Sequence, residues 1–295
     1  MRIFDSHIKD TVNSRLLGLE DYFISDIVFF YGPIFPPADK VFRDFIEKLR
    51  SQYPDKERVV IFLTTSGGLA ETVEKMVDII RFHYKEAYFV VPDYAMSAGT
   101  IFCMSGNKIF MDYSSSLGPI DPQVYTGKEG RDIVSALGYL DQVERMIEKS
   151  KKGKLTDAEL VMLQELDLAM LSSYEQAKNL TITLLKTWLV QYKFADWNIH
   201  QTDPKKIGKP VTPKEKEKRA KEIASMLSDN KLWHSHGRNI GVNTLTDLLR
   251  LKIDDYSHDV ELRNMIRGYH DFLMEYIQRE KVPVFLHSKN YFWGE

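Results

Sequence analysis

Short apolar runs alternate with helical stripes of apolar residues along the first 111 residues. The runs are apolar on both faces, as in buried parallel strands, and they cover residues 26–32, 58–65, 87–92 and 108–111. The stripes repeat every three or four residues and predict helices at residues 41–49, 70–84 and 97–105. This alternation is the pattern of right-handed βαβ crossovers, so the sequence predicts an α/β fold with a parallel sheet built from βαβ units.

From Gly130 onward the apolar pattern is almost entirely helical. The residues that share one face of the first predicted helix are Ile133, Leu137, Leu140, Val143 and Ile147. Thr156 and Glu159 have the spacing of a capping box, before a long striped segment that reaches toward Tyr192. Thr212 and Glu215, with a proline between them, have the same spacing and predict another helix start.

This change of pattern divides the chain into two regions. Residues 1–195 are predicted to form the α/β core with a helical extension. Residues 196–295 are predicted to form a helical C-terminal region, which packs on the sheet. The segment 198–211 is polar and contains prolines, so it is predicted to be a loop.

Composition and charge narrow the class of protein. Of the 295 residues, 43% are hydrophobic and 28% are charged, the balance of an ordinary globular chain. A net charge of -2 and a pI near 6.5 argue against a nucleic-acid-binding protein, which is usually strongly basic on one face. No run resembles a secretory signal or the roughly 18 apolar residues of a membrane helix, so we expect no transmembrane segment and a cytoplasmic location.

The single cysteine limits the chemistry further. Cys103 lies between Ile101 and Met104 and is interpreted as a small buried hydrophobic residue. One cysteine can form neither an internal disulfide nor a metal site built on cysteine pairs. His234 and His236 are two residues apart without a third clear ligand, which is a poor pattern for zinc. We expect no metal and no cofactor.

The stretch LTTSGGLAE, residues 63–71, follows a predicted strand and precedes a predicted helix. Gly67 and Gly68 can adopt positive φ and can bring backbone N–H groups to an open surface at a helix start. Such fixed donors suit an oxyanion hole and would equally suit a phosphate. The stretch lacks the Gly-Lys-Ser/Thr of a P-loop and the three glycines of a dinucleotide fingerprint.

Two further residues have the chemistry of a hydrolytic site. Ser97 precedes a predicted helix, where it could cap the helix or act as a nucleophile favoured by the helix N-terminus. Asp121 lies in the rigid turn SSSLGPIDPQ, where it could be a structural turn residue or a fixed carboxylate. A serine nucleophile needs a base, and the chain has no histidine between His83 and His200. The base would therefore come from the helical half.

Four motifs in order resemble one known family: TTSGG, AMSAGT, SSLGPIDPQ and SHGR, the last at residues 235–238. The chain resembles the serine dehydrogenase proteinase family of the Clp-protease/crotonase superfamily, which is related to the Clp proteolytic subunit and to signal peptide peptidase. The resemblance is good over residues 27–123, and it reaches the helical half mainly through SHGR. It implies a ClpP/crotonase-like sheet and a serine peptidase that hydrolyses peptide bonds.

The resemblance also implies a role for each site residue. Ser97 would be the nucleophile, His236 the general base and Asp121 the carboxylate that orients the imidazole. The backbone N–H groups of Gly68 and Ala98 would form the oxyanion hole, with Gly67 supporting the turn. In the Clp subunit the histidine follows soon after the serine, and here that position holds none.

The base therefore has rivals, namely His234 or a lysine such as Lys108 or Lys128. The alternative functions are a crotonase-like acyl-thioester enzyme, for which Glu71 is the one obvious acidic group, and an inactive scaffold of the same fold. The expected partners are a peptide or protein substrate and further copies of the chain, because relatives in the superfamily form rings. No ATPase motif is present, so unfolding a protein substrate would need a separate ATPase.

Overall fold

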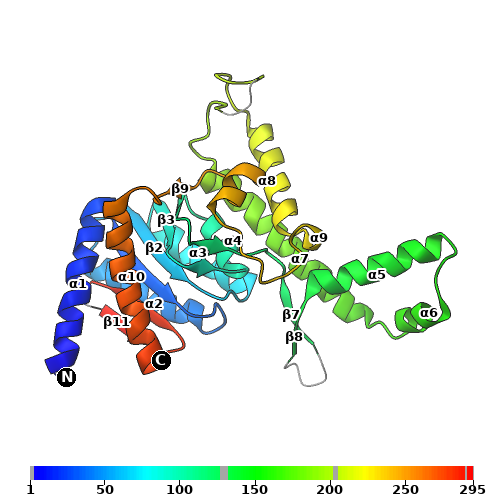
Figure 1. The fold of residues 1–295 in the computed structure, drawn as a ribbon, viewed down its shortest axis with the longest axis horizontal. Coiled ribbons are helices and arrows are strands. Elements are labelled where there is room, and N and C mark those ends of the chain that lie inside the picture. Colours follow the sequence, from blue (N-terminus) through cyan, green and yellow to red (C-terminus); the bar gives the residue numbers. More distant parts are fainter. Residues whose placement is uncertain (1–2, 127–131, 202–204, 290, 295) are drawn as a thin grey trace.

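The computed structural model describes residues 3–126, 132–201, 205–289 and 291–294. Its main sheet has seven strands in the order β11-β10-β1-β2-β3-β5-β9 (Figure 1). Five neighbouring strands run parallel: β1 (Asp26–Tyr31), β2 (Arg58–Thr64), β3 (Glu86–Val91), β5 (Lys108–Met111) and β9 (Asp254–Asp255). Two antiparallel strands complete the edge beside β1: β10 (Phe285–Ser288) and β11 (Tyr291–Gly294). The predicted α/β fold with a mostly parallel sheet is confirmed.

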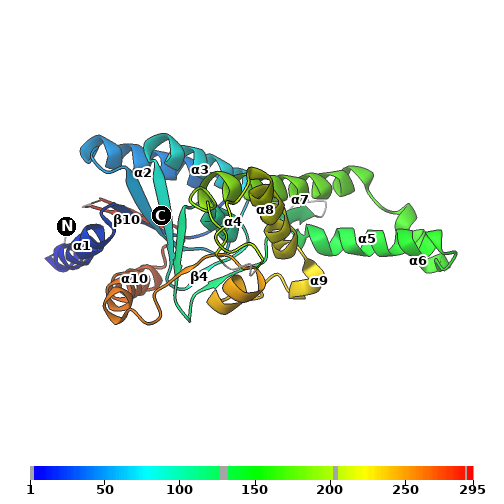
Figure 2. The ribbon, with the colours of Figure 1, turned by 90° about the horizontal axis from the view of Figure 1, so that it is seen from above.

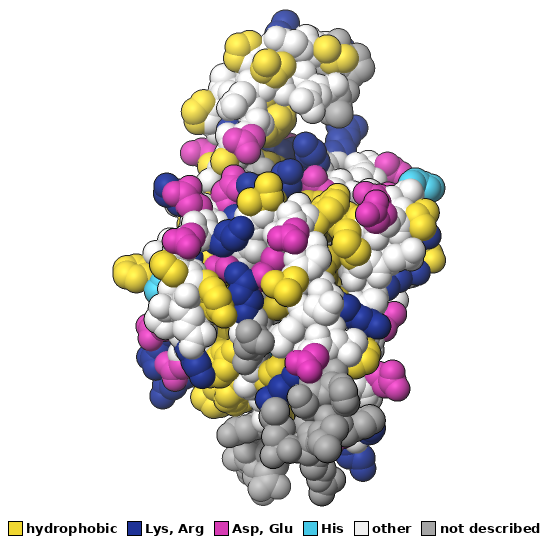
Figure 3. Space-filling view, turned by 90° about the vertical axis from the view of Figure 1, so that its left-hand side faces the viewer, with side chains coloured by type: hydrophobic (Ala, Val, Ile, Leu, Met, Phe, Trp, Pro, Cys, Tyr) yellow, Lys and Arg dark blue, Asp and Glu magenta, His cyan; other side chains and the backbone are white. Residues whose placement is uncertain are grey.

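Helices cover both faces of this sheet (Figure 2). One face carries α2 (Ala38–Gln52), α3 (Ala70–His83) and α4 (Ala98–Met104), and the other carries α1 (Ile3–Phe23) and α10 (Val260–Glu280). Side chains of β1 alternate between the two cores, because successive residues of a strand point to opposite faces. Val28 packs toward α2 to α4, and Phe29 packs toward α1 and α10. The end of the molecule formed by α1 mixes apolar side chains with charges of both signs (Figure 3).

The middle of the chain forms a helical arm that projects from the body (Figures 1 and 2). Its helices are α5 (Ala136–Lys151), α6 (Asp157–Gln164) and α7 (Leu168–Trp188). α7 returns to the body, where it contacts α3, α4 and α8. The predicted capping box of Thr156 and Glu159 is confirmed, although the helix that follows it is short and α7 starts separately.

Smaller elements fill the space between the arm and the sheet. These are the π-helical turns η1 (Leu189–Lys193) and η2 (Thr244–Leu248), and the helices α8 (Pro213–Leu227) and α9 (Asn230–Trp233). The capping box of Thr212 and Glu215, with a proline in the first turn, starts α8 as predicted. Apolar residues of α7, α8 and η2 join the same core as α2 to α4, so the helical half packs on the sheet as expected.

The prediction of an almost purely helical second half was wrong in its details. A hairpin of β7 (Gln123–Thr126) and β8 (Asp132–Ser135) precedes α5, so Ile133 lies in a strand and not on the predicted helical face. Three strands of the main sheet, β9 to β11, also come from residues after 195. The division at residue 195 stays a prediction, and the regions on either side of it share one sheet. Among the described residues, no helix has both the length and the apolar character needed to cross a bilayer.

Candidate active site

Ser97 lies between a two-stranded ladder and the start of α4. The ladder pairs β4 (Tyr94–Ala95) with β6 (Ser116–Leu117), near the carboxyl end of β3. Ser97 occupies the N-cap position of α4 with φ 50° and ψ -111°, and its side chain caps no backbone N–H there. A positive φ costs a serine about 1–3 kcal/mol and persists only where surrounding structure imposes it. The capping role considered for Ser97 is therefore absent from this structure.

Gly67 and Gly68 form a turn that lies directly against Ser97. The Ile34 N–H donates to the Gly67 carbonyl at 2.8 Å, and the Leu69 N–H donates to the Ile34 carbonyl at 2.9 Å. A Cβ on Gly67 would lie 3.0 Å from the Ser97 Cβ, and one on Gly68 would lie 2.0 Å from the Ile34 carbonyl oxygen. Only glycine fits at these two positions.

Two backbone donors beside Ser97 are unused. Neither the Gly68 N–H nor the Ala98 N–H donates a hydrogen bond to any acceptor in the described part of the chain. Both residues line the same pocket as Ser97. The Ala98 N–H also belongs to the first turn of α4, where backbone N–H groups have no partner within the helix. The site thus presents a buried hydroxyl-bearing residue and unpaired N–H donors on one pocket wall.

Thr100 holds the segments around Ser97 together. Its hydroxyl oxygen lies 2.9 Å from the Ala95 carbonyl oxygen and 2.8 Å from that of Gly118, and it accepts from the Gly118 N–H at 3.0 Å. A Cβ on Gly118 would lie 3.2 Å from the Ser97 nitrogen. The turn that leads to Asp121 is therefore fixed against the segment that carries Ser97.

Asp121 and His236 face each other although they are far apart in the sequence. Asp121 is buried, and its Oδ1 accepts from the Leu137 N–H at 3.2 Å at the start of α5. Its Oδ2 lies 3.6 Å from His236 Nδ1, and neither of these two atoms has a hydrogen-bond partner in the described residues. His236 is brought there by the segment after α9, where Leu117 and Ile240 exchange backbone hydrogen bonds of 3.0 and 2.8 Å.

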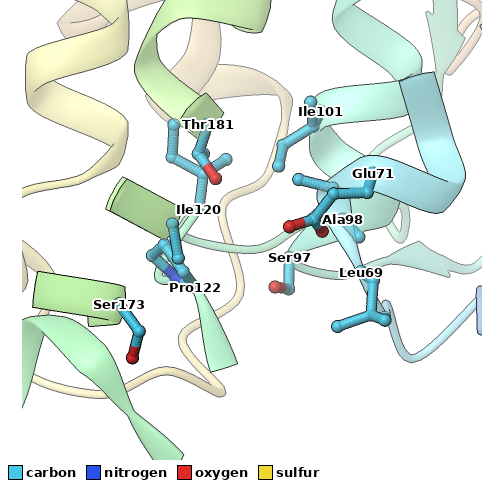
Figure 4. Close-up of a pocket in the computed structure, with 12 residues that line it drawn as sticks. Leu69, Glu71, Ser97, Ala98, Ile101, Ile120, Pro122, Ser173 and Thr181 are labelled. Carbon is cyan, nitrogen blue, oxygen red and sulfur yellow. The ribbon is translucent and has the colours of Figure 1, made fainter. Parts of the chain in front are cut away.

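A pocket of about 270 Å³ opens beside Ser97 (Figure 4). Its lining comes from the Gly-Gly turn, from α3, α4 and α7, and from the turn that leads to Asp121: Gly68, Leu69, Ala70, Glu71, Ser97, Ala98, Ile101, Ile120, Pro122, Ser173, Ala177 and Thr181. The Ser97 hydroxyl and the Glu71 carboxylate point toward the same space (Figure 4). His236 and Asp121 do not line this pocket.

Sequence reasoning did not identify Ser173, Ala177 and Thr181 as site residues. They come from α7 at intervals of four, so they lie on one face of that helix. The signal that could have found them is the spacing of four between these small side chains, which places them in one row along the helix. Small residues there leave the space that forms the pocket.

The rival bases occupy different places. His234 is exposed and ends α9 with φ 61°, in the left-handed region. Lys108 is exposed and begins β5, so it lies at the amino edge of the parallel sheet, whereas Ser97 follows the carboxyl end of β3. Lys128 lies outside the described residues.

Cys103 offers no competing nucleophile. It lies in α4 and is fully buried, as the sequence predicted, and burial raises the pKa of its thiol. A thiol with a raised pKa supplies little thiolate at neutral pH. In the part of the chain that the structure describes, no group of three or more His, Cys, Asp or Glu side chains could hold a metal ion.

The sheet of βαβ units, with Ser97 and the Gly-Gly turn near the carboxyl ends of β2 and β3, defines an α/β protein with a candidate hydrolytic site. The model of the ClpP-like SDH-type serine proteinase family matches residues 26–290, and the chain belongs to that family. The resemblance stated from the four motifs is confirmed.

Two individual proteins match short parts of the chain. An uncharacterized protein of Methanocaldococcus jannaschii is 33% identical over 81 residues, which are 28% of each chain. A second uncharacterized protein of that organism is 31% identical over 71 residues, which are 24% of each chain. The chain thus matches about a quarter of the length of these curated relatives.

Two solved structures have low similarity to the chain. One is a variant of the 1510-N membrane-bound stomatin-specific protease, with 14% identity, a TM-score of 0.44 and 80% of both chains covered. The other is a variant of the same protease in complex with a substrate peptide, with 19% identity and a TM-score of 0.34. It covers 55% of this chain and 57% of that one.

Proposed function

We propose that the protein is a serine peptidase in which Ser97, His236 and Asp121 cooperate. The Ser97 oxygen attacks the carbonyl carbon of the peptide bond while His236 takes the hydroxyl proton. His236 then gives that proton to the leaving amine, and a covalent acyl-enzyme remains on Ser97. Water, deprotonated by His236, releases the acyl group and restores the serine. Asp121 orients the imidazole and stabilises its charged form.

The conformation of Ser97 is the observation that carries this proposal. A serine at a helix start usually caps the helix, and the Ser97 side chain does not. Its φ is positive, which has an energetic cost, and its hydroxyl points toward the pocket (Figure 4). Strain of this kind clusters at functional sites, where it positions a reacting group in advance.

The unused N–H groups of Gly68 and Ala98 support an oxyanion hole. They line the pocket that holds Ser97, and Gly67 keeps the turn close to the serine. Donors that are already fixed need no reorganisation when negative charge develops on the carbonyl oxygen. By comparison with other oxyanion holes, each donor contributes about 3–4 kcal/mol to the transition state.

The approach of Asp121 and His236 supports His236 as the base. Both the Asp121 Oδ2 and the His236 Nδ1 are buried without a hydrogen-bond partner, which is costly unless they serve each other. Their separation of 3.6 Å exceeds a hydrogen bond. Because catalytic hydrogen bonds often tighten only in the substrate complex, we expect the two atoms to close to about 2.8 Å there.

Covalent labelling with a fluorophosphonate tests the nucleophile. We expect the wild-type protein to be labelled at Ser97, as located by peptide mass spectrometry, and Ser97→Ala to remain unlabelled. Ser173→Ala is the matched control, because it removes another hydroxyl from the same pocket. Failure of the folded wild-type protein to label would refute the peptidase proposal and favour the inactive scaffold.

Three single variants test the base. His236→Ala should reduce the labelling rate by about 10²-fold or more, since general-base catalysis contributes about 10² to 10⁴. His234→Ala and Lys108→Ala should keep most of the rate. Normal labelling of His236→Ala, with loss in either of the other two, would reassign the base.

A crotonase-like acyl-thioester enzyme is the second candidate function. The observation in its favour is that Glu71 lines the same pocket as Ser97 and the free N–H groups, so an acidic group is present there. Incubation with a set of acyl-thioesters separates the two functions. Turnover of a thioester that survives Ser97→Ala and is lost in Glu71→Gln would establish the second one.

We further propose that the chain acts on peptides or loose protein segments in the cytoplasm and assembles with copies of itself. The arm supports assembly, because α6 has no buried residue although its middle reads Leu160, Val161 and Met162. Ile147 and Leu168 are also exposed there. Light scattering should show an oligomer that dissociates in a Val161→Glu, Met162→Lys double variant. A monomeric wild-type protein would refute assembly.

A further inference from the structure

The pocket beside Ser97 combines apolar walls with one charge. Leu69, Ile101, Ile120 and Pro122 are the larger apolar residues of its lining. Its volume of about 270 Å³ lies just below the roughly 300–1,000 Å³ of clefts that enclose drug-sized ligands. It therefore suits one side chain of a peptide and not the whole segment. Because it adjoins Ser97 and Ala98, that side chain belongs to the residue whose carbonyl group is attacked.

Glu71 supplies the charge. It is the sole charged residue that lines the pocket within the described chain, and the lining contains no lysine or arginine. Its carboxylate forms no ion pair or hydrogen bond with any described residue. Glu71 is exposed, so it stands at the mouth of the pocket and not at its base. A cation that reached it would pair with a carboxylate that has no competing partner.

The arrangement suits a side chain with an apolar stem and a cationic tip. Lysine and arginine bury their methylene stems along apolar surface while the charged end stays near water. Ile101 and Ile120 flank the space into which Glu71 and Ser97 point (Figure 4). The Thr181 side chain lies at the same space and adds a hydroxyl that can accept a hydrogen bond. An acidic side chain would instead meet the Glu71 carboxylate.

We propose that Glu71 is a specificity-determining residue that makes this pocket select lysine or arginine in the peptide. The inference rests on the proposed function only in assigning the selected residue to the acyl side of the cleaved bond. Pairing with an exposed carboxylate gives a modest gain, and we expect a preference of about fivefold for lysine over an apolar chain of similar length.

Equilibrium binding to the Ser97→Ala variant tests the selection without any chemistry. The probes are three fluorescein-labelled peptides, identical except for one central lysine, norleucine or glutamate, and the readout is fluorescence anisotropy. We expect the lysine peptide to bind about fivefold more tightly than the norleucine peptide, and the glutamate peptide to bind most weakly. The lysine advantage should shrink as salt is raised, since exposed charges are screened.

Two further changes, each made in the Ser97→Ala background, locate the effect. Glu71→Gln should remove the lysine advantage and leave the norleucine peptide unaffected. Asp78→Asn is the matched control, because it removes the same charge from an exposed position two turns further along α3, outside the pocket. Equal binding of lysine and norleucine peptides, an unchanged ratio in Glu71→Gln, or no binding of any peptide would overturn the inference.

Hydrolysis of the same peptides by the wild-type protein separates this inference from the proposed function. Selective binding of the lysine peptide without hydrolysis would refute the peptidase proposal and leave the selectivity assigned to Glu71 intact. Hydrolysis that favours the norleucine peptide over the lysine peptide would support the peptidase proposal and overturn the selectivity assigned to Glu71. Cleavage on the carboxyl side of lysine, lost in Ser97→Ala, would support both.

Discussion

The Gly-Gly turn beside Ser97 should tolerate no side chain at its second glycine. In Gly68→Ala the new Cβ would lie 2.0 Å from the Ile34 carbonyl oxygen and 2.5 Å from its carbon, so the turn must retreat by more than an ångström. That retreat breaks the two backbone hydrogen bonds that join Ile34 to the turn. Each contributes about 0.5–1.5 kcal/mol net, and overpacking adds about 1–3 kcal/mol. We expect the free energy of unfolding to fall by about 2–6 kcal/mol.

Urea unfolding, followed by tryptophan fluorescence, measures this loss. The urea concentration at the midpoint should fall, while the slope of the free energy of unfolding against urea concentration should stay constant. Gly18→Ala is the control, because a Cβ there meets nothing within 4 Å inside α1, and it should stabilise the protein by about 0.5–1 kcal/mol. Fluorophosphonate labelling of Gly68→Ala should also fall. A loss below about 1 kcal/mol in Gly68→Ala would refute the steric reasoning.

Three other predictions concern buried groups. Burial lowers the pKa of His287 to about 3, so the neutral ring is the folded form. The contribution of His287 to the free energy of unfolding should be constant above about pH 6.5 and should fall below it by about 1.4 kcal/mol per pH unit. His287→Gln should lose this slope in urea unfolding at pH 7 to 4; an equal slope in both proteins would contradict it. Thr100→Val leaves the Gly118 N–H without its acceptor and should cost about 1–3 kcal/mol, most of which Thr100→Ser restores. Cys103 should react with a thiol reagent only on unfolding, and rapid reaction of the native protein would show that α4 opens.

The strands and helices of the first half were predictable because each carries its own pattern. β1, β2, β3 and β5 are apolar runs of four to seven residues. The predicted helix at residues 41–49 corresponds to α2, which buries Phe42, Phe45, Ile46 and Leu49 at helical spacing. Local composition and final packing agree in this half, so the periodicity alone was sufficient.

The elements that were missed depend on distant partners. β9 is only Asp254–Asp255 and has no apolar residue, so it is a strand only because it pairs with β5. β10 is four residues long and pairs with β1, which lies at the other end of the chain. Patterns within a short window do not encode such pairing, and four residues are too few for periodicity to distinguish strand from helix.

The residues of the candidate site also differ in whether local sequence or distant contacts determine their placement. The turn at Gly67 and Gly68 was predictable because glycine adopts positive φ readily, whereas the sequence left open whether its N–H groups face an oxyanion or a phosphate. Whether Ser97 caps α4 depends on its φ, which the packing of the Gly-Gly turn and Gly118 imposes from outside the local sequence. The approach of His236 to Asp121 depends on the pairing of Leu117 with Ile240. The motifs identified candidates, and tertiary contacts determined which of them meet.

The antiparallel pair β10 and β11 has a consequence for how the chain is made. β1 is buried on both faces and reads DIVFFY, and among the described residues its outer edge is closed by β10. During synthesis that edge stays open until residues 285–294 leave the ribosome, almost the whole chain later. An open apolar edge is a template for pairing with other chains. Truncation before Phe285 should therefore yield aggregated protein even though Ser97, Asp121 and His236 are all present.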